Sequence, residues 1–189
     1  MRHLLAVLLL LPTFSSLSAA PVAESERLPI DLRRTTLVVR DIDRSLAFYR
    51  DALGMKVIYD NLIRTPRDAA TDEEAQRASR LVFLRANDDF VGIIGLLQYR
   101  KPVKPAANQG DESFSTGSVV LLFNAQDLDA TFAQAQKAVG VRVLSAPRRV
   151  EYPSYDGQST IPVMVSVLTD PDGFVIELNQ LLVDNPQQD

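Results

Sequence analysis

The chain has 189 residues, with 20 Lys and Arg against 24 Asp and Glu, and a formal net charge of −4. This acidic balance, with its basic residues scattered, argues against nucleic acid as a partner. There is no cysteine, so disulfides and thiol chemistry are excluded. The length suits one domain with a substantial core, and a small molecule or another protein is the expected partner.

The first twenty residues have the pattern of a secretory signal peptide. Arg2 and His3 precede eight continuous apolar residues, and Ser18 and Ala20 are small residues at the spacing that a signal peptidase recognises. The apolar run is too short to span a bilayer. The sequence therefore predicts cleavage after Ala20 and a secreted or periplasmic protein without stable membrane insertion. An uncleaved membrane anchor is the alternative interpretation. Residues 21–32 are polar and are expected to be an extended lead-in.

The first half of the predicted domain begins with an apolar strand followed by a helix. Asp41 or Asp43 can cap the helix N-terminus, because a short carboxylate accepts hydrogen bonds from free backbone N–H groups. Gly54 is expected to end the helix in the left-handed conformation. The elements predicted for this half are strands at 33–40, 55–63, 80–85 and 90–99, the helix between Asp41 and Gly54, and a charged loop with a short solvated helix at 64–79.

A linker at 101–116, containing two prolines and a glycine, precedes a second half that repeats the first. Asp127 and Gly140 are separated by thirteen residues, as are Asp41 and Gly54, and the two pairs lie 86 residues apart. The apolar positions between them follow one helical stripe in both halves: Ile42, Leu46, Tyr49 and Leu53, then Leu128, Phe132, Ala135 and Val139. Such a repeat predicts a duplicated structural unit.

The second half is expected to contain the same order of elements. Strands are predicted at 118–124, 141–144, 162–168 and 174–181, a helix at 128–139, and irregular chain from 145 through Tyr155. The turn Asp170-Pro171-Asp172-Gly173 is a strong hairpin signal. Each half is therefore βαβββ. The predicted fold class is α+β, with two pseudo-symmetric modules, 33–100 and 117–182, forming a curved mixed sheet with a cleft, and with a tail at 183–189.

Two segments of this chain resemble a known family. The segment TTLVVRDIDRSLAFYRDALGMKVI resembles the opening module of the vicinal oxygen chelate superfamily, and LTDPDGFVIELNQ resembles its closing motif. This group includes glyoxalase I, methylmalonyl-CoA epimerase, extradiol dioxygenases and bleomycin-resistance proteins. The resemblance covers residues 33–182 and implies the paired βαβββ fold, and family members often build their sites across the two subunits of a homodimer.

The resemblance also implies four metal-ligand positions, one on the first and one on the last strand of each module. In this chain they correspond to Arg34, Val120, Glu177 and either Gly95 or Ile93. Only Glu177 can bind a metal, and the single histidine of the chain lies in the predicted signal peptide. Catalytic zinc or iron needs about three protein ligands, and the guanidinium of Arg34 would repel a cation. We therefore expect the fold without a metal or another cofactor.

Strand alternation predicts which side chains line the cleft. The ligand-binding candidates are Arg34, Thr36, Gly95, Val120, Leu122, Asn124, Glu177 and Tyr155. An apolar cavity with a few polar groups is typical of a small-molecule site. Arg34 either clamps an anionic group of a ligand or forms an ion pair with Glu177, and Tyr155 either covers the cleft or packs on its loop.

The leading functional prediction is an exported, metal-free protein that binds a small organic molecule, similar to the bleomycin-resistance branch. The alternative is a glyoxalase-like lyase or isomerase that acts without the usual metal ligands; the sequence identifies no catalytic residue for it. A third interpretation is a structural or interaction module whose cleft is filled by its own side chains, such as those of residues 64–79.

Overall fold

A computed structural model describes residues 22–105, 116–155 and 157–182. The signal peptide predicted for 1–20, much of the predicted linker and the tail at 183–189 lie outside the described residues. In chain order, the elements are η1 (Glu24–Glu26), β1 (Arg34–Val38), α1 (Ile42–Leu46), η2 (Ala47–Ala52), β2 (Lys56–Thr65), β3 (Arg77–Arg85), β4 (Ile93–Lys101), β5 (Val120–Asn124), α2 (Leu128–Ala135), β6 (Arg142–Pro153), β7 (Thr160–Thr169) and β8 (Val175–Leu181).

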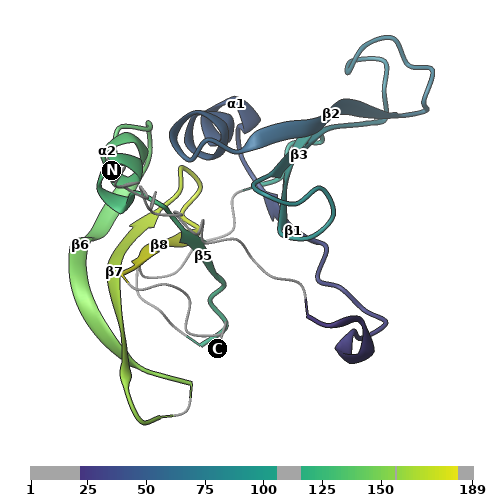
Figure 1. Cartoon of the computed structure of the whole chain (residues 1–189). Helices are drawn as coiled ribbons and strands as arrows, with labels where there is room; N and C mark the ends of the chain where they lie inside the picture. Colours follow the sequence, from purple (N-terminus) through teal and green to yellow (C-terminus); the bar gives the residue numbers. More distant parts are fainter. Residues whose placement is uncertain (1–21, 106–115, 156, 183–189) are drawn as a thin grey trace, which may run out of the picture.

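The strands form two four-stranded sheets with the same topology (Figure 1). The order is β1-β4-β3-β2 in the first sheet and β5-β8-β7-β6 in the second. In each sheet the first strand is parallel to the last strand, and the other neighbours are antiparallel. The predicted fold class, α+β with two βαβββ modules, is confirmed. We call the sheet β1–β4 with α1 and η2 module one, and the sheet β5–β8 with α2 module two.

The helix boundaries follow the local signals in the sequence. The side chain of Asp41 accepts hydrogen bonds from the backbone N–H groups of Asp43 and Arg44, and Asp127 accepts one from Ala130. Gly54 and Gly140 have positive φ angles of 76° and 92°, where an L-residue would be strained. The first helix is not α-helical throughout, because it continues from α1 into the π-helix η2.

The helices of the two modules share one hydrophobic core. Phe48 and Tyr49 are fully buried and pack edge to face, with ring centroids 4.9 Å apart. The ring of Tyr49 also contacts Phe123 of module two at 6.4 Å. Burial of such large apolar side chains is the main stabilising contribution to a domain of this size. The modules therefore fold around a common centre, which fixes one sheet relative to the other.

Two regions differ from the sequence prediction. Within 64–79 the strands β2 and β3 extend further than expected, and the residues between them form turns, with no helix. Asp72 fixes this turn by accepting from Arg64 at 2.8 Å and from Arg100 at 2.5 Å. In module two, β6 continues to Pro153, where irregular chain was predicted. Two register shifts in its pairing with β7 break the side-chain alternation, which hides this strand in the sequence.

No helix among the described residues is long and apolar enough to cross a membrane.

Candidate functional site

The concave face of module one is organised around Gly95. Residues Thr36 and Gly95 are register partners in the parallel pair β1–β4. A Cβ atom at position 95 would lie 2.7 Å from Thr36 Oγ1 and 3.1 Å from Arg34 Cδ. The Arg34 side chain therefore lies across the space that a larger residue would fill. Strand alternation predicts that Arg34, Thr36 and Gly95 share one face of the sheet. The structure has these three residues as neighbours on that face.

Arg34 extends over this glycine toward aromatic side chains on the next two strands. Its Nε donates to Thr36 Oγ1 at 3.0 Å, and its guanidinium carbon lies 4.1 Å from the centroid of the Phe83 ring. Phe83 in turn stacks on Tyr59, with centroids 4.7 Å apart and an interplanar angle of 22°. The arrangement is a row of one cation and two aromatic rings across β1, β3 and β2, in which the cation–π contact orients the guanidinium.

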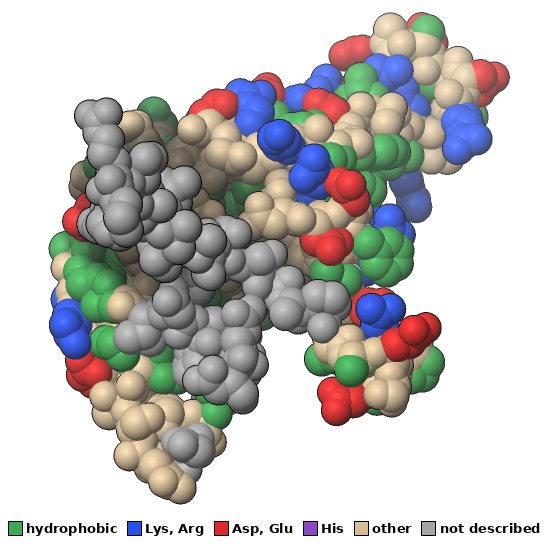
Figure 2. Space-filling model, in the orientation of Figure 1, with side chains coloured by type: hydrophobic (Ala, Val, Ile, Leu, Met, Phe, Trp, Pro, Cys, Tyr) green, Lys and Arg blue, Asp and Glu red, His purple; other side chains and the backbone are tan. Residues whose placement is uncertain are grey.

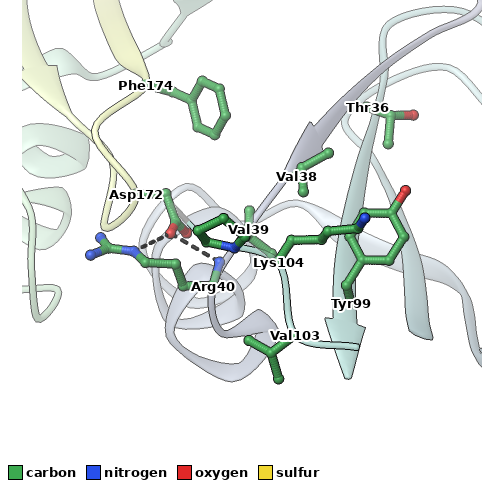
Figure 3. Close-up of a pocket in the computed structure, with 10 residues that line it drawn as sticks. Thr36, Val38, Val39, Arg40, Tyr99, Val103, Lys104, Asp172 and Phe174 are labelled. Carbon is green, nitrogen blue, oxygen red and sulfur yellow. Dashed lines mark hydrogen bonds and ion pairs between the residues drawn. The ribbon is translucent and has the colours of Figure 1, made fainter. Parts of the chain in front are cut away.

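A pocket of ≈ 420 Å³ begins at Thr36 and lies between the modules (Figure 3). The end of β1 contributes Val38 on one side, and the β7–β8 hairpin contributes Phe174 on the other. Tyr99 of β4 and Lys104, just after β4, complete its polar and aromatic lining. The volume and the mixture of apolar walls with a few polar groups are typical of small-molecule sites.

Lys104 is a second cation near this site, and it lines the pocket, whereas Arg34 is connected to the lining through its hydrogen bond to Thr36. Its ammonium nitrogen lies 5.7 Å from the centroid of the Tyr99 ring, and the side chain extends across the pocket toward that ring (Figure 3). Within the described part of the chain, neither Lys104 nor Arg34 has an acidic partner. Both cations are thus available to an anion, whereas Arg40, also at the pocket, is engaged by Asp172 at 2.8 Å.

Two carboxylates of the β7–β8 hairpin attach module two to module one. Asp172 accepts from the backbone N–H and the Nε of Arg40, and from the hydroxyl of Ser45. Asp170 is fully buried and accepts from the hydroxyl of Tyr49 at 2.9 Å. Burial raises the pKa of Asp170 to about 6, although hydrogen bonds from backbone N–H groups and from Tyr49 oppose this shift. Burial, together with the charge of Asp170, raises the pKa of Tyr49 well above its usual value.

The candidates from module two lie on their own sheet, apart from the Arg34 cluster. Val120 is the register partner of Val175, and Leu122 is the partner of Glu177. Glu177 accepts a hydrogen bond from the side-chain amide of Asn179 at 3.0 Å. The possible ion pair between Arg34 and Glu177 is not formed, although both residues are described, because each has another partner.

The remaining candidates are more dispersed. Asn124 lines a different pocket, of ≈ 380 Å³, at the end of β5. Leu122 is 59% exposed, and Tyr155 is 79% exposed on the loop between β6 and β7. Thr36 is the candidate that lies in the pocket of Figure 3. The eight candidates are therefore not gathered into one pocket by the described part of the chain.

The register of the strands also identifies the fourth position of the implied metal set. Thr36 and Leu122 are equivalent in the repeat, and they pair with Gly95 and Glu177 respectively. Gly95 is therefore the counterpart of Glu177. Glycine, Arg34 and Val120 supply no metal-ligating atom, so the side chains at the four positions do not fit a divalent metal. The described residues contain no cluster of three or more His, Cys, Asp or Glu that could hold a metal ion.

The profile of the Glyoxalase/Bleomycin resistance protein/Dioxygenase superfamily matches residues 31–178, most of the chain. The chain belongs to this superfamily. Solved structures show the same fold at low identity, so they support the fold of this superfamily member and not a particular activity.

Three of these structures have TM-scores of 0.50 or above. A glyoxalase family protein from Bacillus cereus has a TM-score of 0.63 at 14% identity, covering 85% of this chain and 100% of that one. A glyoxalase I mutant from Zea mays has a TM-score of 0.50 at 20% identity, covering 79% of this chain and 46% of that one. The Leishmania major glyoxalase I has a TM-score of 0.50 at 22% identity, covering 80% and 86%. No curated protein matches the sequence.

Several residues of the site do not follow from the sequence. Phe83 and Tyr59, beside Arg34, lie on strands whose cross-strand register cannot be read from the chain. In the lining of the pocket, Lys104 lies in the segment predicted as a linker, and the sequence pattern of Asp172 and Phe174 indicates only a turn and a strand. The one signal in the sequence for this part of the site is the turn Asp170-Pro171-Asp172-Gly173. Its two carboxylates offer more hydrogen-bond acceptors than a hairpin turn requires, which indicates that they bind groups outside the turn.

Proposed function

We propose that this superfamily member binds a small organic anion with an aromatic or apolar body, without a metal, in the pocket between the modules. The observation that carries the proposal is a pair of cations, Lys104 in the lining of the pocket and Arg34, which donates to Thr36 at the edge of that lining. Each is held beside an aromatic ring and has no acidic partner in the described part of the chain. A guanidinium recognises a carboxylate or phosphate through paired hydrogen bonds. Phe174, Val38 and Tyr99 would contact the apolar body.

The lyase or isomerase alternative has no comparable observation in its favour. A general base needs a free acceptor within reach of the substrate. The carboxylate that lines the pocket is Asp172, and both of its oxygens accept hydrogen bonds from module one. The interaction-module alternative requires a cleft filled by the chain's own side chains, such as those of residues 64–79, and none of residues 64–79 lines the pocket.

Export remains a proposal of the sequence alone, because residues 1–20 lie outside the described structure. It is checked by the N-terminus of the protein recovered from the periplasm, which should be Pro21.

The binding proposal is tested with small anions and their neutral isosteres. Benzoate and phenyl phosphate, compared with benzamide and benzyl alcohol, would be titrated calorimetrically into the wild-type protein and into Arg34→Gln. We expect the anions to bind more tightly, and Arg34→Gln to lose about tenfold in affinity for them, because a hydrogen bond to a charged group contributes about 1.5–3 kcal/mol.

Arg33→Gln is the matched control, since Arg33 also lies beside an aromatic ring, Phe90, at 4.6 Å, whereas it is Arg34 that donates to Thr36 in the lining of the pocket. Its affinity for the anions should equal that of the wild type. Neutral isosteres that bind as well as the anions, or an Arg34→Gln variant with unchanged affinity, would contradict the proposal.

A further inference from the structure

Strand β2 is an outer edge of its sheet and has no neighbour on one side among the described strands (Figure 1). Its ten residues therefore present a row of backbone N–H and C=O groups toward solvent. Such an edge can pair with another strand, and proteins that do not use it for pairing usually protect it with proline, charge, a bulge or a cover.

The side chains of β2 increase the tendency of this edge to pair. Five of them are apolar or aromatic and are 36–46% exposed: Val57, Ile58, Tyr59, Leu62 and Ile63. They lie on both faces of the strand, whereas a strand at a free surface normally alternates between apolar and polar residues. In Figure 2 the projecting arm that contains β2 carries hydrophobic side chains between charged ones.

The other outer edge, β6, is protected in the ways that β2 is not. Its pairing with β7 is broken by two register shifts, and the middle of the strand contains Pro147, Arg148 and Arg149. Proline cannot donate a ladder hydrogen bond, and bulges twist an edge away from a potential partner. In β2 the single register shift lies near its start, between Val57 and Tyr59, so the stretch from Tyr59 to Thr65 is regular.

We propose that β2 pairs antiparallel with the β2 strand of a second copy of this chain, across a two-fold axis. A two-fold axis through Leu62 pairs the whole regular stretch, Tyr59 to Thr65, with the same stretch of the second copy. This register places Asp60 opposite Arg64 of the second copy. It also places Leu62 opposite Leu62 of the second copy on the same face, and Asn61 opposite Ile63 on the other face. Opposite charges and apolar side chains on directly opposed residues both stabilise a pair of strands, and an interface that brings the same patch of two copies together closes as a dimer.

The charges of this register are present at neutral pH. A hydrogen bond from Arg80 lowers the pKa of Asp60, and hydrogen bonds from Arg64 and Arg100 lower the pKa of Asp72. Asp60 and Arg64 thus enter the interface as parts of existing ion pairs with Arg80 and Asp72. This inference is argued from the edge of β2 and not from the pocket between the modules, which no residue of β2 lines; the two sites are connected through Tyr59, which stacks on Phe83 beside Arg34.

The absence of cysteine allows a direct test on the full mature chain. Directly opposed residues have Cβ atoms about 4.5–5.5 Å apart, so Leu62→Cys should be within reach of its own copy for a disulfide. We expect this variant to convert to a covalent dimer under mild oxidation. Val143→Cys on β6 is the control, because Val143 is as exposed, at 44%, as Leu62, at 46%; it should remain uncrosslinked.

A second pair of variants tests the interface without a crosslink. Light scattering should give the mass of a dimer for the wild type and for Val143→Lys, and the mass of a monomer for Leu62→Lys, which opposes two ammonium groups at the axis. Circular dichroism spectra that match the wild type would show that both variants are folded. A monomeric wild type, a dimeric Leu62→Lys, or equal crosslinking of the two cysteine variants would overturn the proposal.

Discussion

The two β-hairpins at the junction between the modules contribute to it in different ways. The hairpin of module two, Asp170–Gly173, directs its carboxylates into module one, where Tyr49, Arg40 and Ser45 donate to them. The hairpin of module one, 86–92, uses its two carboxylates within module one: Asp88 accepts from the backbone N–H groups of Phe90 and Val91, and Asp89 forms an ion pair with Arg85. One hairpin is bound to the opposite module, and the other leaves a pocket of ≈ 380 Å³ beside it.

Part of the difference follows from one position of the repeat. Tyr49 in the first helix, whose hydroxyl donates to Asp170, corresponds to Ala135 in the second helix, which has no polar side-chain atom. Both residues are fully buried, so both satisfy the hydrophobic pattern. A duplicated fold therefore does not imply a duplicated junction, because the polar contacts depend on single side chains that the repeat does not preserve.

The largest expected effect is a difference in stability between variants of the two hairpins. Asp170→Ala removes the acceptor of three donors, Tyr49 Oη and the N–H groups of Asp172 and Phe174. Because buried donors without partners are costly, we expect a loss of about 3 kcal/mol or more in the free energy of unfolding, measured by urea denaturation. Asp88→Ala, in the exposed hairpin, should have a much smaller effect. Equal losses would mean that the hairpins contribute equally.

An intermediate effect is expected at the two glycines that end the helices. At Gly140 an added Cβ would lie 2.5 Å from Arg44 Nη2 and 3.3 Å from the Cα of Pro171, in the bound hairpin, whereas at Gly54 it would meet no atom within 4 Å. Left-handed backbone alone costs about 1 kcal/mol for alanine, so Gly54→Ala should lose about that amount and Gly140→Ala about 2 kcal/mol, with the contact to Pro171 added. Thermal melts of both variants measure this difference, and a larger loss in Gly54→Ala would contradict it.

The last expected effect is a dependence on pH. Burial raises the pKa of Asp170 to about 6, above the value near 3.9 of an unfolded aspartate. Between these values the folded state binds a proton that the unfolded state releases. The contribution of Asp170 to stability is therefore fully present below pH ~4 and is lost as the pH rises through ~6.

The test compares the wild type with Asp170→Asn, which does not titrate at this position. The free energy of unfolding of the wild type minus that of Asp170→Asn should fall between pH 4 and pH 7 in urea denaturation. A difference that stays constant or rises with pH would show that the carboxylate is stabilised by its donors more than it is penalised by burial.

The parts of this structure that follow from the sequence are those determined by short stretches of chain. Asp41, Asp127, Gly54 and Gly140 act through neighbouring backbone, so their spacing revealed the repeat and the fold. The stack of Arg34 on Phe83 depends on three strands that are far apart in the chain, and the contact of Tyr49 with Asp170 depends on how two modules meet. The side-chain alternation along β1 placed Arg34 beside Gly95, but no local pattern indicates which ring Arg34 would contact.

The glycine at position 95 also restricts how this chain could change in the future. A glutamate there would supply a carboxylate at the register counterpart of Glu177, but its Cβ would lie 2.7 Å from Thr36 Oγ1 and 3.1 Å from Arg34 Cδ. The Thr36 hydroxyl and the Arg34 side chain would both have to move, which would disturb their hydrogen bond and the contact of Arg34 with Phe83. The residue at position 95 is thus coupled to the row of Arg34 and the two rings, and a substitution there cannot leave that row unchanged.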